Sequence, residues 1–191
     1  MTKPQLTKKY IRKARRLPKQ SSPLFFIFVG VPGSGKTTYA HFLEKYKSAV
    51  RVATDDIKLH YIKNNIQYTI STLFEDQKDI FEEVAKYDVN IISDSNSATD
   101  KFRQKLKLFA KNHGFKPIVI YCSAKTDSIK ERIHQRKESI GIKNFYISPQ
   151  RISKYLKELE PPRKCIFINT EIEFNKSKKY FIKSLNKWIK S

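Results

Sequence analysis

Eight residues near the start of the chain have the types and spacing needed to hold phosphate groups. The stretch Gly-Val-Pro-Gly-Ser-Gly-Lys-Thr, residues 30–37, fits the pattern G-x-x-x-x-G-K-[ST]. In such a loop, backbone N–H groups of a glycine-rich turn face inward at the head of a helix, where the helix dipole favours anions. Lys36 can then reach the β- and γ-phosphates of a nucleotide, and the Thr37 hydroxyl can hold Mg²⁺. The residues predicted to contact the nucleotide are Gly33, Ser34, Gly35, Lys36, Thr37 and Thr38.

The residues on either side of this loop are those that its geometry requires. An apolar run, residues 24–29, leads straight into the loop, and the segment 37–43 that follows can start a helix. Strand, glycine loop and helix start are the context that a phosphate-binding loop needs. The chain holds only five glycines, and Gly30, Gly33 and Gly35 are three of them. A chance surface turn with a passing lysine is therefore the weaker interpretation.

Polar residues also follow the next two predicted strands. Asp55 and Asp56 come directly after the second predicted strand, and Asp94 and Asn96 come after the third. In open parallel sheets, ligands bind at the carboxyl ends of the strands. A carboxylate there can orient a substrate hydroxyl and accept its proton during phosphoryl transfer. Acids at such ends are also frequent helix N-caps, so Asp55 or Asp56 could serve only in that way.

A later predicted helix supplies two arginines. Arg132 and Arg136 are four residues apart, which puts them on one helix face. Guanidinium groups that reach a triphosphate neutralise the charge that builds up in phosphoryl transfer. On an exposed helix, however, they could simply pair with the nearby Asp127 and Glu131. The spacing alone leaves both interpretations open.

Apolar patterns along the rest of the chain predict alternating strands and helices. The predicted strands are 24–29, 49–53, 89–92, 117–121 and 165–168, and the predicted helices are 56–66, 70–86, 99–112, 126–138, 149–159 and a closing helix. Gly114 is a typical helix stop, and Ser148-Pro149 is a typical helix start. This order predicts an α/β fold with a parallel five-stranded sheet sandwiched by helices. A chain of 191 residues without repeats or linkers predicts one domain over residues 24–191.

Charge is the second strong signal in the sequence. Lysine and arginine number 39 against 18 acids, which gives a net charge of +21. Residues 1–23 hold eight basic residues and no acid, so we expect a basic, flexible N-terminal arm. A short helix through Tyr10 and Ala14, or an organelle transit peptide, is the alternative for that arm. A positive field concentrates polyanions and favours nucleic acid as a partner, although lysine is also the default solvated residue.

Other features favour a cytoplasmic protein. No apolar run reaches the ~18 residues that a membrane span needs, and the N-terminus lacks the apolar core of a secretory signal. Cys122 and Cys165 have no metal-site spacing, and the four histidines do not cluster. The cysteines are therefore expected to be buried thiols in a reducing compartment.

Together these residues resemble the kinase domain of phage-type polynucleotide 5′-kinases and related small P-loop kinases, among them AAA-type and zeta-toxin-like kinases. The likeness covers about residues 24–160 and is carried by Gly30 to Thr38, Asp55 to Lys58, Ile91 to Asn96, Phe109 to Lys111 and Lys130 to Arg136. The resemblance implies a P-loop kinase-like fold with a helical lid over about residues 136–158. It also implies transfer of the γ-phosphate of ATP, with Mg²⁺, to a 5′-hydroxyl of DNA or RNA.

The resemblance also implies roles for single residues. Asp55 would be the general base, Lys36 and Arg136 would stabilise the transition state, and Arg132 would hold nucleotide phosphate. The implied substrate-binding residues are Asp56, Lys58, Asp94 and Asn96. At Lys58 the family usually has an arginine that grips the terminal phosphate of the substrate, and lysine lacks its bidentate fork.

Two other functions remain open from the sequence. One is a kinase of a small hydroxyl compound, of the zeta-toxin or antibiotic-phosphotransferase kind. The other is a nucleic-acid-binding module that uses nucleotide as a switch.

Overall fold

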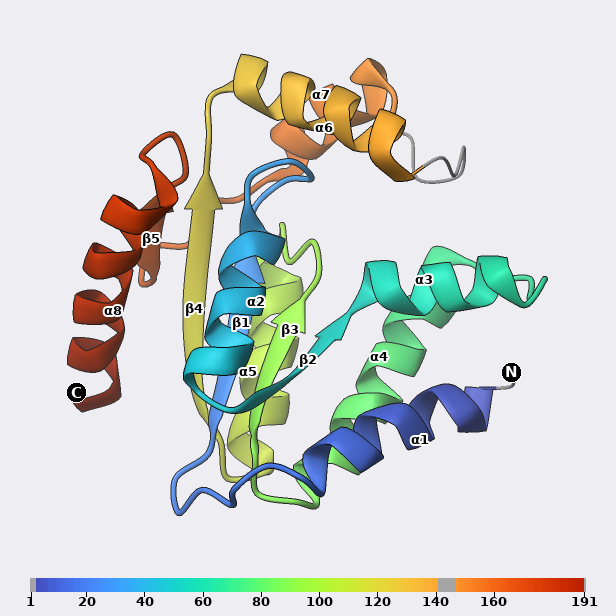
Figure 1. Cartoon of the computed structure of the whole chain (residues 1–191), viewed down its shortest axis with the longest axis vertical. Helices are drawn as coiled ribbons and strands as arrows, with labels where there is room; N and C mark the ends of the chain where they lie inside the picture. The colour runs from blue at the N-terminus through green and yellow to red at the C-terminus, as the bar shows by residue number, and fades with distance from the viewer. Residues whose placement is uncertain (1–2, 141–146, 191) are drawn as a thin grey trace. The chain divides into compact units, whose positions relative to one another are not determined.

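The computed structural model of the protein describes residues 3–140 and 147–190, and Figure 1 shows its elements. A five-stranded sheet has the order β2-β3-β1-β4-β5. The strands are β1 (Leu24–Val29), β2 (Ala49–Ala53), β3 (Asn90–Asp94), β4 (Lys116–Ser123) and β5 (Ile166–Asn169). The helices are α1 (Lys3–Ala14), α2 (Lys36–Tyr46), α3 (Thr54–Lys63), α4 (Ile70–Ala85), α5 (Asp100–Asn112), α6 (Thr126–Ile140), α7 (Pro149–Glu158) and α8 (Phe174–Lys190). The α/β fold with five parallel strands, predicted from the sequence, is confirmed.

The chain forms two compact units, which are described one at a time. Unit 1 comprises Met1–Ile27, Thr37–Ser95 and Leu106–Pro117. Unit 2 comprises Phe28–Lys36, Asn96–Lys105 and Ile118–Ser191. The predicted bounds of an arm (1–23), a single domain (24–191) and a lid (136–158) remain predictions, and residues 141–146 of that lid lie outside the described residues.

Unit 1 is built on strands that are buried along their whole length. β3 pairs in parallel with both β2 and β1, and the register sets Ala53 opposite Asp94. Both faces of a parallel sheet are covered, so its strands are mostly apolar, as β1 is. β3 is equally buried but also carries Asn90, Ser93 and Asp94. The ring of Phe25, in β1, packs against those of Phe81, Phe109 and Phe115, with ring centroids 5.0 to 6.2 Å apart. These contacts join β1 to α4 and α5 in one core.

The basic N-terminal segment differs from the flexible arm expected for it, because residues 3–14 form the helix α1. Leu6, Tyr10 and Ala14 are spaced by four residues, so they share one face of this helix, and all three are buried. α1 contacts α4 and β2 within unit 1 (Figure 1). Burial of side chains such as Leu6 contributes ~1.5–3 kcal/mol each, which outweighs the tendency of a charged segment to stay disordered.

Unit 2 contains the paired strands β4 and β5 with the helices that follow them. The two strands are parallel, with Tyr121 opposite Phe167, and α8 contacts β5. α7 starts as the sequence predicts, since the Ser148 side chain accepts a hydrogen bond from the backbone N–H of Arg151 and proline occupies the first turn. Over residues 3–140 and 147–190, no helix has the length and apolarity needed to cross a membrane.

Candidate functional site

The phosphate-binding loop, in unit 2, has a backbone that only glycine permits. Gly30 has a φ of +142° and Gly35 a φ of +85°, both in the region that side chains disfavour. A Cβ atom at Gly30 would lie 2.4 Å from the carbonyl oxygen of Cys122 and 2.5 Å from Oγ of Ser34. The Ser34 side chain therefore occupies the space that a side chain at Gly30 would need. These contacts explain the glycine spacing of the motif.

The lysine of the motif is held against its own loop. Lys36 Nζ donates hydrogen bonds to the carbonyl oxygens of Gly30, at 2.7 Å, and Val31, at 2.9 Å. Only 9% of Lys36 is exposed, so the ammonium group has a defined position beside the loop. An ammonium group fixed in this way binds a phosphate group better than one that moves in solvent, because the side chain loses little further conformational entropy on binding.

Arg132 lies at this loop, together with Thr170, a residue that the sequence analysis missed. Arg132 Nη1 donates to Thr170 Oγ1 at 3.0 Å, and Nη2 donates to the Thr170 carbonyl oxygen at 2.9 Å. Nη1 also lies 3.4 Å from the carbonyl oxygen of Gly33, and Thr170 Oγ1 donates to that of Ser34 at 3.1 Å. Arg132 and Thr170 thus hold the loop carbonyls in place. Thr170 directly follows β5, so its place at a strand end was the available signal.

The acidic partner of Arg132 is not one of those considered from the sequence. Arg132 Nη2 lies 3.6 Å from Glu171 Oε1, whereas Asp127 lies 3.7 Å from Lys130 Nζ. A role for Arg132 toward nucleotide phosphate remains a prediction. Arg136 lies in α6, but its side chain is outside the described residues, so its predicted catalytic role stays a prediction as well.

Apolar side chains pack the phosphate-binding loop against α6 and α7. Val31 forms a buried cluster with Ile129 and Ile133 of α6 and Ile152 of α7. A Cβ atom at Gly33 would also approach the Ile129 carbonyl oxygen to 2.9 Å. The loop is therefore fixed on one side by packing and on another by the hydrogen bonds of Arg132 and Thr170.

Thr37 is the residue predicted to hold magnesium. It is half-buried in the first turn of α2, and Thr38 beside it is exposed. Magnesium that binds with nucleotide phosphates takes few ligands from the protein and keeps several waters, and a hydroxyl oxygen suits it. The donor set therefore fits the metal, and no cluster of three His, Cys, Asp or Glu residues occurs among the described residues.

Unit 1 contains the predicted acids, and a buried arginine joins two of them. Arg51 Nε donates to Asp94 Oδ2 at 2.8 Å, and Arg51 Nη1 donates to Asp56 Oδ2 at 2.7 Å. The side chains of Arg51 and Asp94 are 7% and 4% exposed, whereas that of Asp56 is 40% exposed. Burial lowers the pKa of Arg51, but the two carboxylates raise it by more, so the guanidinium stays charged. The structure thus unites Asp56 and Asp94 through a residue that the sequence analysis had treated only as part of a strand.

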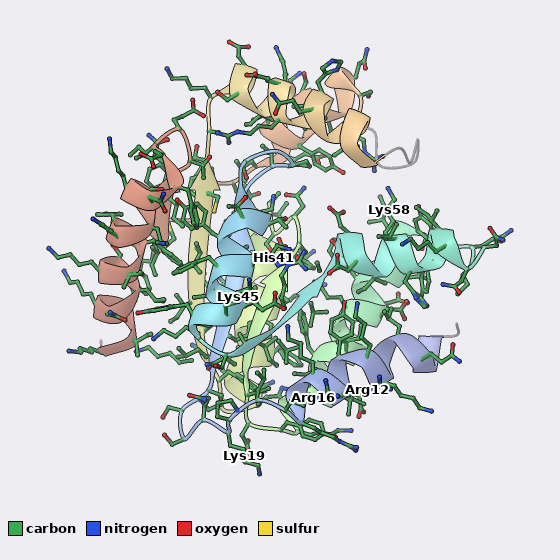
Figure 2. The ribbon with its side chains drawn as sticks, in the orientation of Figure 1. Arg12, Arg16, Lys19, His41, Lys45 and Lys58 are labelled. Carbon is green, nitrogen blue, oxygen red and sulfur yellow. The ribbon has the colours of Figure 1, made fainter. Side chains whose placement is uncertain are left out.

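The alternative interpretation of Asp55 and Asp56, as helix caps, does not fit α3. The N-cap of this helix is Ala53, which offers no side-chain hydrogen bond, and both acids lie in the first turn. A negative charge there is favoured by the helix dipole but satisfies no cap. Asp55 is exposed, and Lys58 lies one turn further along α3 and is half-buried (Figure 2). The roles of Asp55 as base and of Lys58 as substrate ligand stay predictions.

The structure also places Asn96 and the two cysteines. Asn96, in unit 2, has a buried Oδ1 without a hydrogen-bond partner among the described residues. Cys122 and Cys165 are not joined in a disulfide; Cys122 is buried, as expected, whereas Cys165 is only half-buried. Burial raises the pKa of the Cys165 thiol, and the positive charge of Arg103 opposes that shift only in part.

Comparison with models of protein families assigns the chain to one family. The family model described as AAA domain matches residues 25–162. The chain belongs to this family. No curated protein sequence matches the chain.

Several solved structures, two of those described here being kinases, share the fold. A gluconokinase from Sinorhizobium meliloti 1021 is 16% identical, with a TM-score of 0.64, and the match covers 88% of this chain and 94% of that one. Kti12 from Chaetomium thermophilum, solved in complex with ADP-AlF3, is 14% identical, with a TM-score of 0.61 and coverage of 85% and 97%. The Mycobacterium tuberculosis APS kinase CysC, in complex with AMPPNP and APS, is 13% identical, with a TM-score of 0.57 and coverage of 88% and 99%. The P-loop kinase-like fold that the sequence predicts is therefore confirmed.

Proposed function

We propose that this protein is an ATP- and Mg²⁺-dependent kinase that transfers the γ-phosphate to a 5′-hydroxyl of DNA or RNA. The observation that carries the proposal is the complete phosphate-binding loop, in which Lys36 is fixed on the carbonyl oxygens of Gly30 and Val31. The family and the shared fold support phosphoryl transfer as the reaction class. The phage polynucleotide kinase subtype rests on the sequence resemblance alone.

The proposed reaction assigns a task to each predicted residue. The 5′-hydroxyl oxygen attacks the γ-phosphorus, the bond between that phosphorus and the β–γ bridging oxygen breaks, and ADP leaves. Asp55 accepts the proton of the attacking hydroxyl, and Lys36 stabilises the negative charge of the phosphoryl group in the transition state. Thr37 would help to hold magnesium, which when bound would neutralise part of the charge on the phosphate oxygens.

The net charge of +21 supports nucleic acid as the acceptor. A small neutral substrate needs no field of that size, whereas a polyanion is concentrated by it. A cytoplasmic location belongs to the same proposal, because both cysteines are free thiols, which fits a reducing compartment.

Transfer from labelled ATP to a 5′-OH oligonucleotide tests the proposal directly. We expect incorporation by the purified protein, and near-total loss of transfer in Asp55→Asn with ATP affinity retained. Asp127→Asn is a matched control, since its side chain is 97% exposed and lies 3.7 Å from Lys130 Nζ, a long ion pair. Absence of transfer to any 5′-OH nucleic acid would refute the proposal, and an active Asp55→Asn variant would refute the assignment of the base.

A kinase of a small hydroxyl compound is the second candidate, and the gluconokinase among the structural neighbours favours it. The dependence of KM on salt separates the two, because each phosphate contact with a nucleic acid releases counterions. A KM that rises steeply with salt supports the nucleic-acid acceptor. A KM that does not change with salt supports the small substrate, and tight oligonucleotide binding without transfer points to a nucleotide-switched binding module.

A further inference from the structure

The positive charge of this protein is concentrated in particular stretches of the chain. Residues 1–47 contain eleven lysines and arginines but one acid, Glu44. Residues 48–123 contain eleven lysines and arginines and ten acids, so they are almost neutral. A general bias of the sequence toward lysine would raise the charge of both stretches. The excess at the start of the chain therefore calls for an explanation of its own.

The single acid of residues 1–47 joins two helices of unit 1. Glu44, in α2, accepts a hydrogen bond from Lys13 Nζ of α1, and Glu44 Oε2 lies 3.2 Å from His41 Nδ1. Burial raises the pKa of Glu44, but the hydrogen bond and charge of Lys13 lower it by more, so the carboxylate is ionised. This acid is engaged within the protein by Lys13 and His41, so it does not neutralise Arg12, Arg16 or Lys45.

The Lys13–Glu44 pair joins α1 to α2. Arg12 precedes Lys13 in α1 and Arg16 lies in the turn that follows this helix, whereas His41 and Lys45 are on α2 with Glu44 (Figure 2). These residues are exposed, and among the residues that the structure describes no carboxylate pairs with Arg12, Arg16 or Lys45. We call Arg12, Arg16, Lys19, His41 and Lys45 the α1–α2 basic face.

The orientation of this face is fixed by the core of unit 1. Leu6, Tyr10 and Ala14 are buried on the opposite side of α1 from Arg12. A rotation of the helix that turned Arg12 toward the protein would expose these three side chains to solvent. Lys19, in the loop after α1, lies 3.8 Å from Asp88, and both side chains are well exposed. A pair of that kind is worth little and leaves the lysine available to another anion.

An exposed aromatic ring adjoins these cations. Tyr46 is 41% exposed at the end of α2, directly after Lys45. Its ring stacks on that of Phe42, with centroids 5.3 Å apart and planes 16° apart, and Lys47 Nζ lies 5.0 Å from its centroid. A base that stacks on Tyr46 would therefore replace the ammonium group of Lys47. Cations along a backbone track beside an aromatic ring for stacking are the features with which proteins bind single-stranded nucleic acid.

We infer that the α1–α2 basic face binds the phosphate backbone of a single-stranded nucleic acid, with a base stacked on Tyr46. The inference takes its ligand class from the proposed function, and it adds a contact surface outside the phosphate-binding loop and the acids. Its role is to hold the strand through its phosphates, which are the same in every sequence. Binding there is therefore independent of base sequence and strongly dependent on salt.

The test is binding of a labelled single strand of about 16 nucleotides with a 5′-phosphate, which cannot accept another phosphoryl group there. The variant Arg12→Gln, Arg16→Gln, Lys45→Gln is compared with Lys183→Gln, Lys187→Gln, Lys190→Gln, three exposed lysines of α8. Both triple variants lose three positive charges, so they change the overall field of the protein equally. Only the first removes the proposed phosphate contacts.

In the first triple variant, we expect the slope of log K (the association constant) against log salt concentration to become shallower by about 2, because each lost phosphate contact removes ~0.7 from it. At 0.1 M salt this corresponds to an affinity ~100-fold lower. Tyr46→Ser should weaken binding at least about fivefold without changing the slope. Equal affinities and slopes for the two triple variants would overturn the inference, and so would tight binding of the protein to phosphatidylserine vesicles but not to the strand.

The result can be told apart from a failure of the proposed kinase activity. Binding that depends on the α1–α2 basic face, in a protein that transfers no phosphate, supports this inference and refutes the kinase. Transfer to 5′-OH strands with unchanged KM in the first triple variant supports the kinase and refutes this inference. Far-ultraviolet circular dichroism and thermal melting verify that the variants, all changed at exposed positions, remain folded.

Discussion

Replacing Arg51 by methionine removes the guanidinium between Asp56 and Asp94 while keeping a side chain of similar length. The two hydrogen bonds are 2.8 Å to Asp94 and 2.7 Å to Asp56. The two partners differ in exposure, 4% for the Asp94 side chain and 40% for that of Asp56. The free-energy cost therefore comes mainly from Asp94, which is left as a carboxylate inside the protein with its partner removed.

Removal of one member of a buried ion pair costs ~3–5 kcal/mol, whereas a pair as exposed as that with Asp56 is worth ~0–1 kcal/mol. We expect Arg51→Met to lower the free energy of unfolding by ~3–5 kcal/mol, and Asp56→Asn by at most ~1 kcal/mol. For a chain of this size, the loss with Arg51→Met corresponds to a decrease in Tm of roughly 6–20 °C.

Urea unfolding followed by circular dichroism measures these values, with an unchanged m-value showing that the native state has stayed compact. Arg16→Met, at an exposed arginine of the same unit, should change stability by no more than ~0.5 kcal/mol. In the double variant Arg51→Met/Asp94→Asn, the two losses should overlap by about 2 kcal/mol. Additivity of the two single losses would refute the idea that Arg51 and Asp94 stabilise one another.

Two further predictions concern α1. Tyr10 is 4% exposed, and its hydroxyl has no hydrogen-bond partner among the described residues. In urea unfolding, Tyr10→Phe should therefore leave the free energy of unfolding unchanged or raise it, whereas Tyr10→Ala should lower it by ~3–5 kcal/mol. A large loss of stability in Tyr10→Phe would show that the hydroxyl does have a partner. Because the pKa of Glu44 is lowered in the folded protein, its pairing contributes stability that is present above pH 4.5 and lost as the pH falls through the folded value. At pH 7, Lys13→Gln should therefore have a free energy of unfolding ~0–1 kcal/mol lower than that of the unchanged protein, and this difference should vanish below pH 4.5. A difference in stability that does not change with pH over this range would argue against the Lys13–Glu44 pair.

The features that could be predicted from the sequence are those that depend on residues close together in the chain. The apolar run 24–29, the glycines of the loop and the stop at Gly114, which has a φ of +76°, depend on local geometry and are found where they were expected. Asp56 and Asp94 could be placed at strand ends for the same reason, because parallel strands end at one edge of a sheet.

The features that the sequence did not predict depend on contacts between distant residues. Arg51 was a charged residue inside a strand that is otherwise apolar, and a buried arginine requires an acidic partner, but which acid it meets follows from the register of β2 against β3. The order in α1 depends on whether α4 and β2 offer Leu6, Tyr10 and Ala14 an apolar surface. Composition alone describes this segment as charged and therefore favours disorder.

The hydrogen bonds that hold the phosphate-binding loop have a consequence for the order in which the protein can be made. Arg132 is 99 residues away in sequence from Gly33, and Thr170 is 136 residues away from Ser34. Contacts of such separation form late, because a long stretch of chain must first be brought together. On the ribosome, the loop is synthesised early but cannot acquire its full set of supporting bonds until residue 170 has left the exit tunnel.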